Sequence, residues 1–345
     1  MRPHWVIPAK AGMTDRAFFA GGLVRAGNLN SDLKDTLASN QLTIGSRGSK
    51  LALFQANWVK SQLEAAHSDL QVVIEIIKTS GDIFLDAPLS QIGGKGLFTK
   101  EIEDALLDGR IDLAVHSLKD LPTVLPGGLS LAAVSRREDA RDAFLSNEHR
   151  SLGALPQGAR VGTSSLRRKS QLLRLRSDLE VANLRGNLDT RIRKLDEKQY
   201  DAILLACAGL DRLGYQHRIA ERLSVQQLCP AVGQGALGIE TRETDAVTRS
   251  RLQWLHHPPT HSAVTAERAF LRRLGGGCQV PIAGHAWIEE SRLEMLGVVA
   301  STDGRQLFRD QASAPVEQAA ELGSQLAERL LAGGARELLN ALSPS

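Results

Sequence analysis

Short apolar runs alternate with helical patterns along most of the chain, beginning at Leu42. Residues 42–46 and 72–77 have the length and the β-branched content of buried strands, and an apolar stripe with helical spacing begins after Ser49. A chain that alternates strands with helices predicts α/β units with parallel strands. Further strands are predicted at residues 111–117, 129–135, 160–164, 181–186, 202–210 and 238–241, and helices at about 99–108, 165–176, 187–198 and 244–256.

The pattern changes from Pro258 onward. A helix that ends at Leu274 precedes the glycine-rich loop 275–281, and three strands and a terminal helix follow that loop. Strands that are grouped together and then followed by a helix predict a small α+β domain. The strands are expected at residues 282–288, 292–300 and 305–312, and the last helix at 315–333.

Composition places the chain among ordinary globular proteins. Of its 345 residues, 42% are hydrophobic and 23% are charged, which excludes the disordered, collagen-like and coiled-coil classes. No apolar run approaches the 18 or so residues of a membrane helix, and charges divide residues 1–40, so we expect neither a membrane span nor a secretory signal. Residues 1–40 also lack strand or helix periodicity and are predicted to form a disordered extension.

The three cysteines, Cys207, Cys229 and Cys278, form no CxxC pair, which argues against a disulfide framework or a structural zinc site. We therefore expect a cytoplasmic protein. Cys278 differs from the other two because three glycines precede it, and a flexible, uncrowded loop can present a reactive thiol. A packed structural thiol is the alternative, and a Cys–His pair would need His285 or a more distant partner.

The net charge of +3 hides an uneven distribution, and 31 of the 42 basic residues are arginine. Residues 160–193 hold nine basic and three acidic side chains, a local charge of +6 against −3 for the remainder. Arg167, Arg168 and Arg185 lie where strands end and helices begin, which is where open α/β sheets bind ligands. This predicts a small polyanionic ligand, because arginine binds carboxylates and phosphates in a two-point fashion. Codon bias and a solvated helix face are the alternatives.

Asp120 follows the predicted strand 111–117, next to Lys119. Burial and cationic neighbours can tune such a carboxylate to exchange protons, although a surface ion pair is the commoner arrangement. The glycine-rich loop 92–98 lacks the spacing of a phosphate-binding loop and is expected to be a lid. Residues 233–238 match GxGxxG but precede a strand, so we reject a dinucleotide site there. His256, His257 and His261 lack a spaced carboxylate ligand and are interpreted as a linker.

Nine sequence blocks, in order from about Leu42 to the C-terminus, resemble porphobilinogen deaminases, also called hydroxymethylbilane synthases. The blocks are SRGSKLALFQA (46–56), GGKGLF (93–98), AVHSLKDLP (114–122), EDARDAF (138–144), GTSSLRR (162–168), LRGNLDTR (184–191), AGLDRLG (208–214), PAVGQGALGIE (230–240) and GGGCQVP (275–281). The resemblance implies two periplasmic-binding-protein-like α/β domains and a smaller C-terminal α+β domain. The expected bounds are 41–135 with 236–256, 136–235 and 257–345.

The resemblance also implies an activity. Cys278 would carry a two-pyrrole primer, the dipyrromethane cofactor, through a thioether. Four porphobilinogen units would then be added head to tail with loss of ammonia, and water would release the linear tetrapyrrole hydroxymethylbilane. Asp120 matches the catalytic aspartate of the family, which would protonate the leaving amine and then stabilise the cation that remains. We expect a monomer with a small-molecule substrate, no metal, no nucleic acid and no membrane partner.

The same resemblance assigns roles to other residues. The cofactor is expected to contact Asp120, Lys119, Arg167, Arg168, Ser165 and Arg185, and the substrate Arg47, Ser49, Arg191, Arg212, Lys95 and Phe98. Lys95 and Phe98 match residues of the lid, which begins at Asp82. One departure from the family pattern is Lys50, which stands where many members have proline.

Two other classes of function remain open from the sequence alone. The two-domain α/β pattern also fits a non-catalytic protein that binds a small anion, but this leaves the block 275–281 unexplained. Nucleic-acid binding through residues 160–193 is disfavoured because no aromatic residue lies between residues 158 and 199 to stack on bases.

Overall fold

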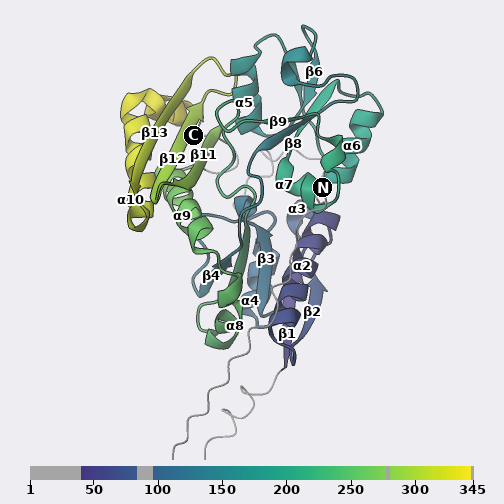
Figure 1. Cartoon of the computed structure of the whole chain (residues 1–345), viewed down its shortest axis with the longest axis vertical. Coiled ribbons are helices and arrows are strands. Elements are labelled where there is room, and N and C mark those ends of the chain that lie inside the picture. Colours follow the sequence, from purple (N-terminus) through teal and green to yellow (C-terminus); the bar gives the residue numbers. More distant parts are fainter. Residues whose placement is uncertain (1–39, 84–95, 277–279, 343–345) are drawn as a thin grey trace, which may run out of the picture. The chain divides into compact units, whose positions relative to one another are not determined.

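The computed structural model describes residues 40–83, 96–276 and 280–342 (Figure 1). The first sheet has the strand order β2-β1-β3-β10-β4. β1 runs parallel to β2 and β3, whereas β10 is antiparallel to both of its neighbours. The strands are β1 (Gln41–Ser46), β2 (Gln71–Ile76), β3 (Leu113–Ser117), β4 (Leu129–Val134) and β10 (Leu237–Arg242).

The second sheet repeats this topology. Its order is β7-β6-β8-β5-β9, so β5 lies between β8 and β9 and runs antiparallel to both, as β10 does between β3 and β4. The strands are β5 (Asp142–Leu145), β6 (Arg160–Gly162), β7 (Glu180–Ala182), β8 (Ala202–Ala206) and β9 (Glu221–Leu223). The two sheets, each interleaved with helices, confirm the predicted α/β class.

Helices pack on the first sheet because its strands alternate apolar residues between two faces. Leu113 and Val115 face one apolar cluster with Val59 and Leu63 of α2 (Lys50–Ala66), which Figure 1 shows alongside β1 and β2. Ala114 faces the other cluster, with residues of α4 (Lys100–Leu107). The remaining helices around the two sheets are α3 (Ser80–Ile83), α5 (Leu166–Leu175), α6 (Leu188–Asp196), α7 (Cys207–Arg212) and α8 (Ala246–Leu252).

A third, antiparallel sheet has the order β11-β12-β13 and packs against helices that precede and follow it. Phe270, Met295 and Leu326 are fully buried in its core. This arrangement confirms the predicted α+β region. The elements are α9 (Pro258–Arg273), β11 (Ile282–Glu289), β12 (Arg292–Ala300), β13 (Leu307–Pro315), α10 (Ala319–Leu330) and α11 (Arg336–Leu342).

Several predicted elements are wrong in extent. The strand expected at residues 181–186 ends at Ala182, in β7, and the helix expected at 244–256 ends at Leu252, in α8. The apolar run 202–210 is a strand only as far as Ala206, and α7 begins at Cys207; a short apolar run does not by itself distinguish a strand from a helix. The terminal helix predicted at 315–333 begins only at Ala319, and a further helix, α11, follows Gly334, whose φ of 110° interrupts the helical backbone.

The domain boundaries stay a prediction, and residues 1–39 of the predicted extension lie outside the described residues. No helix in the described ranges is long and apolar enough to cross a membrane.

Candidate active site

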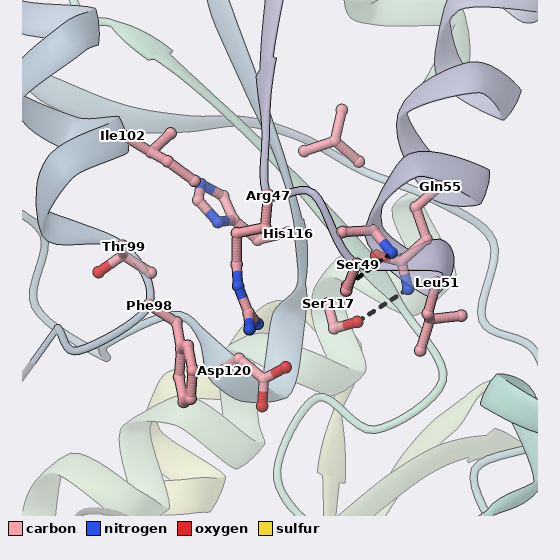
Figure 2. Close-up of a pocket in the computed structure, with 12 residues that line it drawn as sticks. Arg47, Ser49, Leu51, Gln55, Phe98, Thr99, Ile102, His116, Ser117 and Asp120 are labelled. Atoms are coloured by element: carbon pink, nitrogen blue, oxygen red, sulfur yellow. Dashed lines mark hydrogen bonds between the residues drawn. The ribbon is translucent and has the colours of Figure 1, made fainter. Parts of the chain in front are cut away.

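A pocket lies at the carboxyl ends of β1 and β3 (Figure 2). Because these strands are parallel neighbours, the residues that follow them meet at one edge of the sheet. The N-terminus of α2 faces the same place, with Ser49 as its cap accepting a hydrogen bond from the Ala52 amide at 3.3 Å. The lining residues are Arg47, Ser49, Leu51, Ala52, Gln55, Phe98, Thr99, Ile102, Val115, His116, Ser117 and Asp120.

Arg47 is held between an acidic and an aromatic side chain. Its Nε donates to Asp82 Oδ1 at 3.1 Å, and its Cζ lies 4.1 Å from the centre of the Phe98 ring. Partial burial opposes ionisation of Asp82, but hydrogen bonds from Arg47 and Thr79 keep its pKa below the ordinary value. Asp82 therefore neutralises the charge of Arg47.

Lys119 and Asp120 lie in a single 3-10 turn, Leu118–Asp120, directly after β3. The Asp120 side chain is exposed and lines the pocket. Burial lowers the pKa of Lys119 to about 8, although the charge of Asp120 opposes the shift. Lys119 Nζ also lies 3.5 Å from Oε1 of Gln234.

Arg167 and Arg168 are buried and share one carboxylate. Arg167 Nη1 lies 2.7 Å from Oδ2 of Asp142, and Arg168 Nη2 lies 2.7 Å from Oδ1. These bonds hold the pKa of Asp142 well below its ordinary value despite complete burial. Arg167 also donates to the Cys229 carbonyl and Arg168 to the Leu204 carbonyl. The two arginines thus have structural partners, and their predicted contact with a cofactor stays a prediction.

Other predicted residues surround this cluster. Ser165 caps α5 and accepts a hydrogen bond from the Arg168 amide at 3.4 Å. Burial and the charge of Arg168 lower the pKa of Arg191 to about 10, while Asp120 raises it and Arg185 lowers it further. Arg185 and Asp120 therefore both lie within electrostatic range of Arg191.

Arg212 is placed differently. Its Nε donates to Oε1 of Glu138 at 3.1 Å and its Nη2 to the Gly235 carbonyl at 2.9 Å, and only 6% of its side chain is exposed. These partners belong to the two segments that connect the first sheet to the second. Arg212 therefore joins the two connecting segments to α7 through these hydrogen bonds, and its contact with substrate stays a prediction. Cys278 and Lys95 lie outside the described residues.

Sequence reasoning missed the central role of Asp142 and of Gln234. Gln234 is 1% exposed, and its amide nitrogen donates to Oδ1 of Asp142 at 3.0 Å while its oxygen faces Lys119. The available signal was an aspartate inside the buried run 142–145 and a glutamine between two glycines. Both side chains connect residues far apart in the sequence, which no local pattern shows.

The first of two family models matches residues 42–250 and is described as "Porphobilinogen deaminase, dipyromethane cofactor binding domain". The C-terminal domain model of the same family matches residues 261–332. The chain belongs to the porphobilinogen deaminase family. This confirms the resemblance inferred from the nine sequence blocks. The family comprises transferases of tetrapyrrole synthesis.

Similar proteins cover nearly the same length. The porphobilinogen deaminase of Syntrophotalea carbinolica is 56% identical over 306 residues, which is 89% of this chain and 97% of that protein. The porphobilinogen deaminase of Pelobacter propionicus is 56% identical over 299 residues, 87% of this chain and 96% of that protein. Among solved structures, a lipoprotein of Bacillus subtilis described as methionine-binding is 13% identical, with a TM-score of 0.40 over 63% of this chain and 90% of that chain.

Proposed function

We propose that this chain joins porphobilinogen units into the linear tetrapyrrole hydroxymethylbilane at the pocket beside Asp120. One observation supports this beyond the family: the charge around Asp120 is unbalanced. Among the described residues, the charges that act on Lys119 and Arg191 come from three arginines and only two carboxylates, so positive side chains outnumber negative ones here. The cations are Lys119, Arg167, Arg168, Arg185 and Arg191, and the carboxylates are Asp120 and Asp142.

The residues present fit a dipyrromethane cofactor, because each of its two rings carries carboxylates and the cluster offers cationic donors. Charge-assisted hydrogen bonds of this kind contribute about 1.5–3 kcal/mol each. Lys119, Arg185 and Arg191 would hold those carboxylates near Asp120, and Cys278 would supply the thioether. When bound, the cofactor supplies the nucleophilic pyrrole ring to which the first unit is joined.

Asp120 is placed to act as the acid and electrostatic group of the reaction. Loss of the amine from porphobilinogen leaves a cation delocalised over the pyrrole, and an exposed carboxylate at the pocket can first donate a proton and then stabilise that charge. Arg47 can receive a substrate carboxylate after Asp82 yields it, and Phe98 provides a flat apolar surface beside it. Ser49 brings the positive end of α2 to the same pocket.

Mass spectrometry of the purified chain tests this proposal directly. We expect a covalent excess of one dipyrromethane on the peptide that contains Cys278, and discrete increments of one pyrrole unit with ammonia release when porphobilinogen is added. Cys278→Ala should lack the excess, whereas Cys207→Ala, at a buried thiol of α7, should retain it. An unmodified native chain that releases no ammonia contradicts the proposal.

We also propose a cytoplasmic monomer, for which light scattering of the purified protein gives the mass.

A further inference from the structure

Three polar side chains interrupt the apolar layer between the first sheet and α4. They are His116 on β3, Glu240 on β10 and Glu103 on α4, and none of them is more than 6% exposed. His116 Nε2 lies 3.0 Å from Oε2 of Glu240. The strand register explains the contact: Glu240 pairs with Ala114, so His116, two residues later, projects from the same face of the sheet.

The hydrogen bonding of this group is incomplete. Within the described part of the chain, Oε1 of Glu240 and Oε1 of Glu103 have no hydrogen-bond partner, and neither does Oγ1 of Thr99 at the start of α4. A buried carboxylate without a partner is costly in its ionised form. Burial accordingly raises the pKa of Glu103, and the charge of Glu240 adds to this shift.

Two ionised glutamates would bury two negative charges next to the apolar cluster of α4. Retention of a proton by Glu103, whose pKa burial raises, would remove one of these charges. Two further charged groups face this set: Arg268 of α9, whose charge acts on Glu240, and Asp104 of α4, whose charge acts on Glu103.

His116 connects the set to the pocket. It lines the pocket together with Asp120 and Arg47, whereas the two glutamates are not among the lining residues (Figure 2). We propose that His116, Glu240 and Glu103 form a buried proton store for the pocket, and that His116 is the member that exchanges protons with it.

This inference rests on the proposed function for its purpose. In each addition the amine nitrogen takes up one proton, the carbon–nitrogen bond breaks, and its electron pair leaves with the nitrogen as ammonia. A carbon–carbon bond then forms, and one proton is released from the ring carbon at which it forms. The cycle therefore neither gains nor loses protons, but release and uptake occur at different atoms and times. A store that holds a proton between them, beside Asp120, meets that need.

Nuclear magnetic resonance of imidazole-labelled protein tests the sharing of protons without relying on activity. His116→Asn identifies the His116 signals. In the native protein we expect these signals to titrate in two coupled steps, and in Glu103→Gln in a single step whose midpoint is lower by about one pH unit. Asp108→Asn removes a carboxylate from the exposed end of the same helix and should leave the native curve unchanged. A native curve with one step, or identical curves in native and Glu103→Gln proteins, overturns the proposal.

Turnover then tests whether the store serves the reaction. In Glu103→Gln we expect the alkaline limb of the kcat profile to move down by about one pH unit, with KM for porphobilinogen unchanged. A purely structural glutamate would lower stability without moving the profile, and that result also overturns the proposal. If the native protein does not turn over porphobilinogen, the proposed function fails, while the titration still decides whether the three residues share protons.

Discussion

Arg47 forms an ion pair with Asp82 beside the pocket, with Nε 3.1 Å from Oδ1, while the ring of Phe98 lies against its guanidinium. The planar guanidinium uses both Nε and Nη2 in this pair, a geometry that lysine cannot reproduce. Arg47→Lys should therefore lower kcat/KM for porphobilinogen by about tenfold or more, equivalent to roughly 1.4 kcal/mol of transition-state stabilisation. Steady-state kinetics gives the value.

The control for Arg47→Lys is Arg110→Lys. Arg110 pairs with Glu75 on the surface, with about half of its side chain exposed, and lies outside the pocket lining. Its replacement should leave kcat/KM unchanged. Equal effects of the two substitutions would mean that the fork geometry of Arg47 has no special role.

Asp120 should be needed for chemistry and not for folding. Its side chain is exposed, so Asp120→Asn should leave the melting temperature and the covalent mass of the primer unchanged. The variant keeps the shape of the side chain but cannot donate a proton or carry a negative charge. We expect turnover to fall by about 10²–10⁴-fold, the range typical of general acid–base catalysis. Near-native turnover in a variant with normal primer attachment would refute the role.

Arg185 tests how the growing chain is positioned. Each added ring brings further carboxylates, so loss of one cation from the cluster around Asp120 should affect some chain lengths more than others. Arg185→Leu should accumulate enzyme at one or two intermediate masses when porphobilinogen is limiting. Intact mass spectrometry of the reaction separates these species. A uniform decrease at every step would contradict selective positioning.

Much of the fold could be predicted from local patterns. The apolar stripe that begins after Ser49 forms α2, with Ser49 as its cap, and the helix over residues 100–107 ends before Gly109, whose φ is 71°. β5 and β9 were not predicted as strands because runs of three or four residues carry little periodicity. They become strands because β5 pairs with β8 on one side and with β9 on the other.

The site was predictable to a smaller extent. The positions of Asp120 and the arginines followed from strand ends, which is a local feature of α/β chains. Whether an arginine faces a ligand or a buried carboxylate depends on a partner far away in the sequence. Arg167 illustrates this, because Asp142 precedes it by 25 residues and the Cys229 carbonyl follows it by 62. His116 likewise is only a single polar residue within a strand in the sequence, and its contact with Glu240 is seen only in the folded structure.

Lys119 predicts how ligand binding depends on pH. Burial lowers its pKa to about 8, so its positive charge is present below that pH and is lost above it. KM for porphobilinogen should therefore rise between pH 7 and 9. Between pH 8 and 9, above the pKa, the rise should be at most about tenfold. In Lys119→Arg, whose guanidinium stays charged throughout, KM should be flat over this range. The same rise in both proteins would assign the dependence to another group.

Asp142 predicts a pH-dependent contribution to stability. Asp142→Asn leaves Arg167 and Arg168 buried without a counter-charge, so the free energy of unfolding at pH 7 should fall by about 3–5 kcal/mol. Because the folded protein lowers the pKa of Asp142, this contribution is complete above the ordinary aspartate pKa of about 3.9 and is lost as the pH falls towards the folded value. The difference in the free energy of unfolding between the native protein and Asp142→Asn should therefore shrink in acid.

Urea unfolding at several pH values measures this difference. Asp178→Asn, at a partly exposed pair with Arg176, is the control and should change stability far less. A constant difference between native protein and Asp142→Asn down to pH 2 would show that the two arginines do not depend on the ionised carboxylate.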